Sequence, residues 1–178
     1  FYMGSEELEN QITAFIDQHL DLFGFEPKDM NFSGLSMGTF GALYYGALYS
    51  PHAILVGKPI VNLGDVAANL KFKRPDELGT SLDMMQLIIG QVSQEGIGQL
   101  NQRFWDRFEK ADFKDTILAL AYMRDDDYDQ QAYPDILEAL YELPVRIISR
   151  HNDASGPIIE WFVTQYKEIM ERDFGRNQ

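Results

Sequence analysis

The sequence predicts an α/β fold in which helices flank a mostly parallel sheet. Four short apolar runs have the composition of buried strands, and segments of helical periodicity separate them; the runs lie at 30–35, 53–56, 116–122 and 144–149. Alternation of strand and helix along a chain is typical of a parallel sheet covered by its crossover helices. With 178 residues and 45% hydrophobic composition, the chain is long enough for one domain, 1–178, with a real core.

The first helix has clear end signals. Ser5 precedes three acidic residues within the first turn, which is a helix start, and Gly24 stops the pattern. Apolar residues recur at helical spacing and predict a face that packs inward: Leu8, Ile12, Phe15, Ile16 and Leu20. The nucleophile strand discussed below follows, and Ser50-Pro51 ends the helix after it.

The region 60–115 is mostly helical and lies between the second and third strands. Two amphipathic faces stand out, one with Leu82, Met85, Ile88 and Ile89, the other with Leu100, Phe104 and Phe108 beside Trp105. This excursion is long enough to form a helical cap over a site. Ordinary crossover helices would give the same pattern, and both interpretations stand.

The last third of the chain completes the alternation. The third strand, 116–122, runs into an acidic segment, Pro134 opens a helix, and the fourth strand, 144–149, continues into a loop at 150–153. Pro157 opens the final helix. Its expected core-facing residues are Ile158, Phe162, Tyr166 and Ile169.

Composition excludes several function classes. The formal net charge of −13 disfavours nucleic acid and anionic membrane surfaces as partners. The chain has no cysteine, which excludes disulfides, thiolate metal ligands and a cysteine nucleophile, and we expect no metal site. No apolar run approaches the length of a transmembrane segment, and no signal peptide is visible. Because the chain begins with Phe1, we expect a fragment or a processed chain.

A G-x-S-x-G motif at Gly34, Ser36 and Gly38 is the sequence form of a nucleophile elbow. A serine there sits in a strained turn between a strand and a helix, so that its hydroxyl stands clear. The two glycines let the strand and the helix pass close together, and Gly41 extends that small surface. The helix N-terminus favours a nearby oxyanion, and the backbone N–H of Met37 is the expected first oxyanion donor. A turn whose serine merely caps a helix is the alternative.

A nucleophilic serine needs a base, and the chain has three histidines. His19 precedes the elbow, and His52 lies at the far end of the elbow helix, roughly 16 Å or more from Ser36. His151 directly follows the fourth strand. Because parallel strands share one carboxyl edge, His151 is expected on the same edge as Ser36.

The orienting acid should follow the third strand, where Asp125, Asp126 and Asp127 stand in a row. Asp126 is preferred because a short turn separates it from the strand end, with Asp127 second and Asp125 third. The resulting order, serine then acid then histidine, is that of an α/β-hydrolase. In this reading His151 takes the Ser36 proton, Ser36 attacks an acyl carbonyl, and the acyl group passes to water or to another hydroxyl. No cofactor is needed, but an acyl donor is.

The elbow sequence at 34–46 resembles that of the second accessory Sec proteins, the hydrolase-like component of the Gram-positive accessory Sec system. Further matching stretches lie at 56–59, 73–75, 122–129 and 150–153. The resemblance covers the whole chain but only the C-terminal part of such a protein. It implies O-acetylation of N-acetylglucosamine on serine-rich repeat adhesins through Ser36, Asp126 and His151, with the donor unidentified. It also implies a cytoplasmic protein, peripheral at the membrane where it meets the accessory translocase and other accessory Sec proteins.

Two other functions remain open. The fold could be retained as a non-catalytic interaction module that docks secretion partners. It could also be a small carboxylesterase or a peptidase catalytic domain. The absence of the N-terminal half of the hydrolase fold argues against a stand-alone enzyme.

That absence carries two expectations. An α/β-hydrolase takes its second oxyanion donor from a loop after an earlier strand, which this chain lacks. The nucleophile strand would also lose a neighbour, and an open parallel edge tends to find another chain. We therefore expect residues 1–178 alone to be nearly inactive, and to self-associate along 30–35 or to bind a separate N-terminal piece.

Overall fold

The computed structural model describes residues 5–68, 86–88, 90, 93–124, 130–153 and 155–175. Its strands form one sheet in the order β1-β2-β3-β4, and every pairing is parallel. The strands are β1 (Asn31–Leu35), β2 (Ala53–Gly57), β3 (Ile117–Met123) and β4 (Arg146–Asn152). The α/β class and the parallel sheet predicted from the sequence are confirmed.

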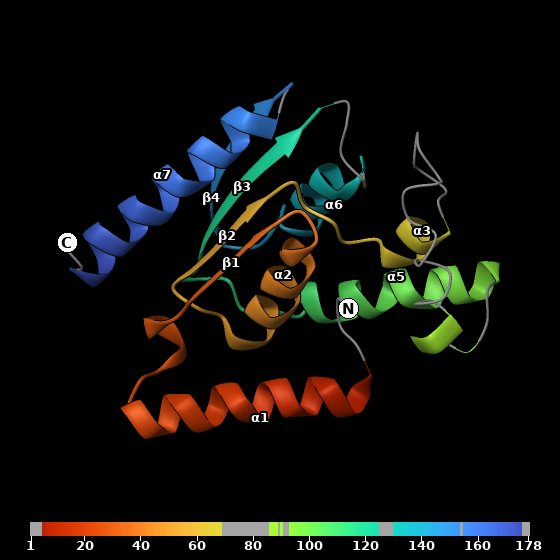
Figure 1. Ribbon diagram of the computed structural model, residues 1–178, viewed down its shortest axis with the longest axis horizontal. Helices are drawn as coiled ribbons and strands as arrows, with labels where there is room; N and C mark the ends of the chain where they lie inside the picture. The colour runs from red at the N-terminus through yellow and green to blue at the C-terminus, as the bar shows by residue number, and fades with distance from the viewer. Residues whose placement is uncertain are drawn as a thin grey trace.

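Helices cover the two faces of the sheet unequally (Figure 1). Of the described helices, α7 alone covers one face, where it contacts β2, β3 and β4, while α2, α5 and α6 gather on the other face. In chain order the described elements between and around the strands are α1 (Glu6–Phe23), the 3-10 turn η1 (Pro27–Asp29), α2 (Gly38–Tyr49), α3 (Leu63–Ala67), α5 (Gln94–Phe108), α6 (Ala132–Ala139) and α7 (Ser155–Phe174).

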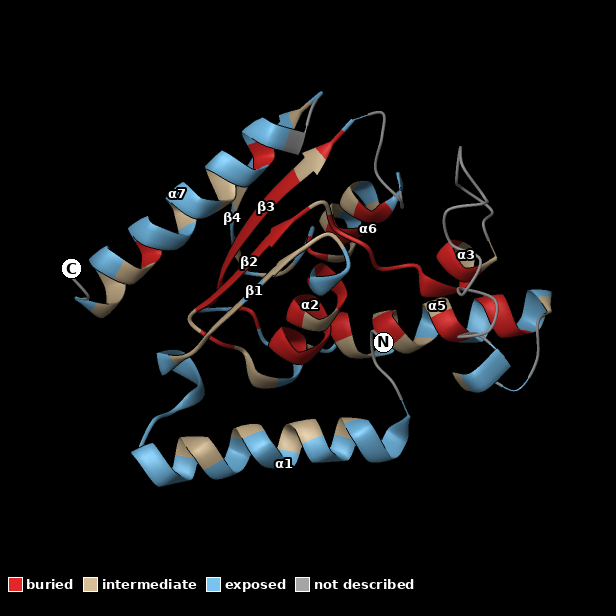
Figure 2. Cartoon of the chain, in the orientation of Figure 1, coloured by how far each residue is buried: buried red, intermediate tan, exposed pale blue. Residues whose placement is uncertain are grey.

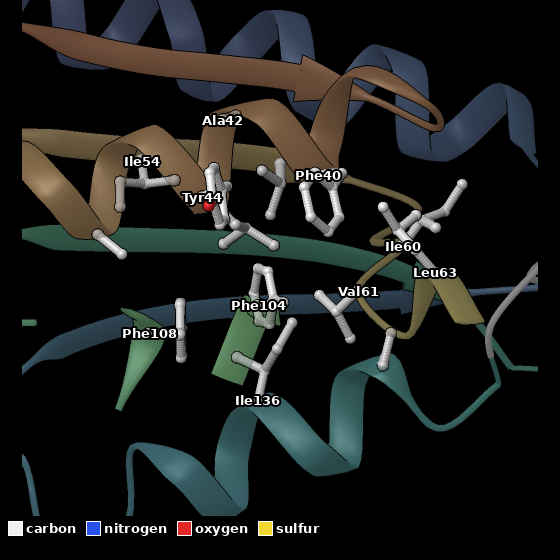
Figure 3. Close-up of a cluster of buried hydrophobic side chains, with 14 of the residues drawn as sticks. Phe40, Ala42, Tyr44, Ile54, Ile60, Val61, Leu63, Phe104, Phe108 and Ile136 are labelled. Carbon is white, nitrogen blue, oxygen red and sulfur yellow. The ribbon is translucent and has the colours of Figure 1, made fainter. Parts of the chain in front are cut away.

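The main core lies on the face that carries α2, α5 and α6 (Figure 2). Phe40 on α2 meets Phe104 on α5 with ring centroids 5.4 Å apart, and Phe104 stacks on Phe108 at 5.2 Å. All three rings are fully buried, and Figure 3 shows them beside Ile136 of α6. The apolar face predicted for this part of the chain is therefore confirmed, and it fixes α2, the helix that follows the serine turn.

Helix α1 departs from the prediction. Its ends are as expected, since the Leu8 N–H donates to the Ser5 hydroxyl and Gly24 has φ 66°. None of its residues is buried, however, and Phe15 is 60% exposed (Figure 2). The predicted inward face is confirmed only in part: Ile12 packs against the main core and Ile16 and Leu20 are half-buried, whereas Leu8 and Phe15 are exposed.

Polar contacts also hold α1. The Glu9 carboxylate accepts hydrogen bonds from Arg103, Arg107 and the Tyr44 hydroxyl, and the Arg107 guanidinium stacks over the Tyr44 ring at 3.9 Å. These charge-assisted hydrogen bonds add to the contact that Ile12 makes with the main core. The periodic apolar residues of α1 could not reveal these bonds.

The final helix is partly as predicted. Ile158 and Ile169 are buried, but Tyr166 is 43% exposed. Tyr166 lines a mostly apolar groove with Ser33 of β1 and Phe162. In the described residues β1 pairs only with β2. The expected association along 30–35 remains a prediction.

The excursion 60–115 is described in part. Both α3 and α5 pack into the main core and against each other. Of the first predicted amphipathic face, Leu82, Met85 and Ile89 lie outside the described residues. The cap interpretation therefore stays a prediction.

A histidine–carboxylate hydrogen bond joins the C-terminal end of α7 to the start of β2. His52 Nε2 lies 2.8 Å from Asp173 Oδ2, and the His52 ring meets Phe174 edge-on at 5.2 Å. His52 is partly buried, with a side chain 27% exposed. Hydrogen bonds from Arg172 and from His52 hold the pKa of Asp173 well below its ordinary value.

Because of this contact, we expect the packing of α7 against the sheet to weaken at low pH. A carboxylate with a lowered pKa in the folded state stabilises the fold above its unfolded pKa of about 4, and that stabilisation is lost as pH falls through the folded value. We expect Asp173→Asn to lower stability at pH 7 and to flatten the dependence of the unfolding free energy on pH below about 4. Urea titrations from pH 7 to pH 2 measure this, and parallel curves for parent and variant would contradict it.

Candidate active site

The turn after β1 has the backbone of a nucleophile elbow. Ser36 has φ 51°, a left-handed conformation that a non-glycine residue rarely adopts. The Ser36 N–H donates to the carbonyl of Gly57 at 2.8 Å, which holds the turn against the end of β2. The surrounding structure thus imposes a strained conformation on the one residue whose hydroxyl the motif presents.

Gly34 explains why the motif needs a small residue before the serine. A β-carbon there would lie 2.2 Å from the carbonyl oxygen of Gly38, so β1 and α2 approach more closely than any side chain allows. The expected role of the other two glycines is wrong, because a β-carbon on Gly38 or Gly41 would meet nothing within 4 Å. The tight contact involves Gly34 on one side and the backbone of Gly38 on the other.

Thr39 locks the turn to the sheet. Its buried hydroxyl donates to the Ser36 carbonyl at 2.5 Å and accepts from the Ile60 N–H at 2.9 Å. The sequence interpretation missed this residue, although a threonine three positions after a turn serine is a familiar local signal.

The N-terminus of α2 lies directly after Ser36. Met37 is the helix N-cap residue with φ −55° and ψ −33°, and its side chain is 45% exposed. Its N–H is among the first of the helix, where N–H groups lack intrahelical acceptors and the helix dipole is positive. This is the position that the sequence assigns to an oxyanion donor.

His151 lies within a strand rather than in the loop expected at 150–153. β4 extends to Asn152, and His151 pairs in register with Tyr122 of β3. The boundary placed at 149 is wrong because backbone pairing with β3 continues past the apolar residues, through Arg150 and His151, which are exposed. Polar residues on an edge strand give little period-2 signal.

Among the described residues, the side chains of Arg124 and Tyr122 lie against the His151 ring. Arg124 Nη2 lies 2.9 Å from His151 Nε2, and the Tyr122 ring lies 5.9 Å away, centroid to centroid. Tyr122 stacks in turn on Tyr133 of α6 at 3.8 Å. A pocket of about 390 Å³ is lined by Tyr122, Tyr133, Ser149, Arg150 and His151. The sequence analysis passed over Arg124, which stands directly before the acidic run.

The described structure places Ser36 and His151 at the same edge of the sheet but not side by side. Leu35 pairs with Gly57, Gly57 with Ala121, and Ala121 with Arg150. Ser36 follows Leu35 and His151 follows Arg150, so the two residues lie at the same height along the sheet, one at β1 and the other at β4. Three inter-strand steps of ~4.8 Å separate their backbones by ~14 Å. The three candidate acids, Asp125, Asp126 and Asp127, lie outside the described residues.

The other histidines are elsewhere. His19 on α1 is half-buried and its ring bonds to the Phe15 carbonyl. His52 stands at the beginning of β2, at the opposite edge of the sheet from Ser36. His151 is therefore the one histidine of the chain at the carboxyl edge.

These features define an α/β protein whose parallel sheet carries a serine elbow at the N-terminus of a buried helix. The chain belongs to the accessory Sec system GspB-transporter family, which matches residues 1–176.

Two curated accessory Sec system proteins align with the whole chain. The protein from Streptococcus gordonii is 42% identical over 183 residues, which are 36% of its length. The protein from Staphylococcus aureus (strain NCTC 8325 / PS 47) is 45% identical over 183 residues, 35% of its length. The chain thus spans about a third of the curated relatives that it matches.

Two solved structures share the fold. A chain of the Glycosylation Associate Protein (Gap123) complex from Streptococcus agalactiae superposes with TM-score 0.89 at 41% identity, over 99% of this chain and 35% of that one. The capsule O-acetyltransferase of Neisseria meningitidis serogroup A superposes with TM-score 0.72 at 18% identity, over 96% of this chain and 67% of that one. Within the described residues, no helix is long and apolar enough to span a membrane.

Proposed function

We propose that this chain carries the nucleophile of a serine-dependent acyl transferase of the α/β-hydrolase type. The strained turn at Ser36, wedged against β2 and followed at once by the α2 N-terminus, is the observation that supports this most directly. A helix-capping serine would not need a positive φ, whereas a hydroxyl presented to a substrate does.

The proposed reaction begins when His151 takes the Ser36 proton and Ser36 Oγ attacks the acyl carbonyl of a donor. The tetrahedral oxyanion forms beside the Met37 N–H. It collapses to an acyl-enzyme, and the leaving group departs with the proton from His151. An acceptor hydroxyl then gives its proton to His151, attacks the acyl carbon and releases Ser36.

Asp126 is the proposed orienting acid, with Asp127 and then Asp125 as alternatives. Each follows β3, the neighbour of the strand that bears His151. A carboxylate there would bond the far ring nitrogen of His151 and stabilise the imidazolium. The second oxyanion donor would come from a part of the longer family proteins that this chain does not include.

The acyl group is proposed to be acetyl, and the acceptor N-acetylglucosamine on a serine-rich repeat glycoprotein destined for the accessory translocase. The likeness to a capsule O-acetyltransferase supports a fold able to serve such chemistry, and the Glycosylation Associate Protein complex supports other accessory Sec proteins as partners. The work would then be done in the cytoplasm before export.

A docking role is the second candidate. The superposition on a chain of a multiprotein complex supports it, and so does the exposed aromatic row on α1 formed by Phe15, Phe23 and the following Phe25. Catalysis and docking predict different outcomes for Ser36→Ala. A pure docking module would support adhesin export equally well with alanine at this position.

Acetyl transfer to a glycosylated serine-rich repeat peptide tests the proposal. With acetyl-CoA or p-nitrophenyl acetate as donor, and the protein expressed at its full natural length, mass spectrometry should detect acetyl esters on the sugar. We expect His151→Gln to lower the rate at least about a hundredfold, because a general base is lost. His19→Gln changes a histidine on α1, outside the candidate site, and is the control that should retain the parent rate. Equal rates for both variants would overturn the assignment of His151.

A further inference from the structure

The contact between Arg124 and His151 constrains the state of the histidine. Arg124 Nη2 lies 2.9 Å from His151 Nε2. A guanidinium is always protonated and only donates hydrogen bonds. Nε2 must therefore accept, which requires a neutral ring with its proton on Nδ1.

That ring nitrogen is the one the proposed reaction needs. In a serine triad the base receives the serine proton on Nε2, while Nδ1–H donates to the acid. Arg124 thus holds the same tautomer that a triad base uses, and it occupies the position that the Ser36 hydroxyl must take. A histidine bonded in this way cannot accept a second proton donor along the same lone pair.

The distance between Ser36 and His151 also shows that His151 cannot act as the base from its position in β4. While His151 stays paired with Tyr122, two strands separate it from β1, and the backbones of His151 and Ser36 are ~14 Å apart. Proton transfer needs a heavy-atom distance of about 3 Å. His151 must therefore leave both its strand position and Arg124 before it can act.

The end of β4 is poorly secured, so this departure has a small cost. Its final bond, from the Arg124 N–H to the Asn152 carbonyl, is 3.4 Å long, at the limit of a hydrogen bond. Asn152 Nδ2 is buried and lacks a partner among the described residues. Arg150 and His151 are exposed, so peeling them away uncovers little apolar surface.

We propose that Arg124 is a positioning residue that retains His151 in β4 and so keeps the base apart from Ser36 until the segment 150–153 is released. The inference rests on the proposed role of His151 as base. Release would give a loop after β4, which is the arrangement that a serine, acid, histidine order requires. In the inactive state, His151 would be held by its contacts with Arg124 and Tyr122.

Reactivity toward diethyl pyrocarbonate tests the retention itself, without any need for turnover. The reagent acylates an unbonded, neutral imidazole nitrogen, and peptide mapping reports each histidine separately. We expect Arg124→Gln to raise the rate at His151 several-fold, with the rate at His19 unchanged as an internal standard. Arg124→Lys, which keeps a charged donor, should restore most of the protection. Arg146→Gln removes the same charge from the other end of β4 and should have no effect.

Turnover of p-nitrophenyl acetate tests the consequence. If Arg124 holds the base back, Arg124→Gln raises the basal rate several-fold, whereas loss of a merely structural residue would lower it. Unchanged His151 reactivity in Arg124→Gln, or a lower rate with increased reactivity, would overturn the inference. A parent protein without Ser36-dependent turnover would instead refute the proposed function, and the reactivity comparison would still decide whether Arg124 retains His151.

Discussion

Replacing Ser36 with alanine is expected to lower acyl turnover by about 10⁴- to 10⁶-fold while leaving the fold intact. The hydroxyl is the proposed nucleophile, and its removal leaves only binding and oxyanion stabilisation. The left-handed φ of 51° disfavours alanine as it disfavours serine, so the stability should change little.

The matched control is Ser33→Ala. Ser33 lies three residues earlier on β1, is exposed, and lines the groove beside α7 rather than the elbow. Hydrolysis of p-nitrophenyl acetate and thermal unfolding should be measured on both variants. Residual turnover of Ser36→Ala within tenfold of the parent would place the chemistry at another residue.

Substituting Gly34 with alanine should destabilise the protein by about 3 kcal/mol or more, the largest stability effect that we expect at the elbow. The added β-carbon would lie 2.2 Å from the carbonyl oxygen and 2.4 Å from the carbonyl carbon of Gly38. Both atoms belong to the backbone of α2, which Phe40 and Leu43 anchor in the core, so the helix cannot yield cheaply.

Gly41→Ala provides a control of opposite sign. Its β-carbon would meet nothing within 4 Å, and it lies inside α2. Alanine is favoured over glycine in a helix by about 0.8–1 kcal/mol, so this variant should be more stable than the parent. Chemical denaturation of the two variants makes the comparison. If Gly34→Ala and Gly41→Ala lost the same unfolding free energy, the close approach of β1 to α2 would not be the reason that position 34 requires glycine.

The elements of this fold that apolar pattern specifies could be predicted from the sequence. The buried runs became β2 and β3, and the periodic face of α5 became part of the core. Helix α1 could not be placed, because Glu9 holds it through two arginines on α5 and the Tyr44 hydroxyl on α2, which lie far away in the sequence. Periodicity reports an apolar face but not what covers it.

The candidate site also has features that the sequence predicts and features that it does not. The motif predicted the strained Ser36 and the close contact at Gly34, because local backbone geometry dictates both. The motif did not show that only Gly34, and not Gly38, must lack a β-carbon. That difference depends on the direction in which α2 leaves the turn. The register of β4 was also missed, because backbone pairing with β3, rather than apolar character, extends that strand to Asn152. Arg124 was overlooked because its partner is distant in the sequence.

Covalent labelling tests the central claim most directly. The protein at its full natural length would be treated with a fluorophosphonate, and the adduct located by intact mass and peptide mapping. Our account predicts a single adduct on Ser36, absent from Ser36→Ala and undiminished in Ser33→Ala. An adduct on another residue, or labelling that persists in Ser36→Ala, would contradict the claim that this elbow presents the nucleophile.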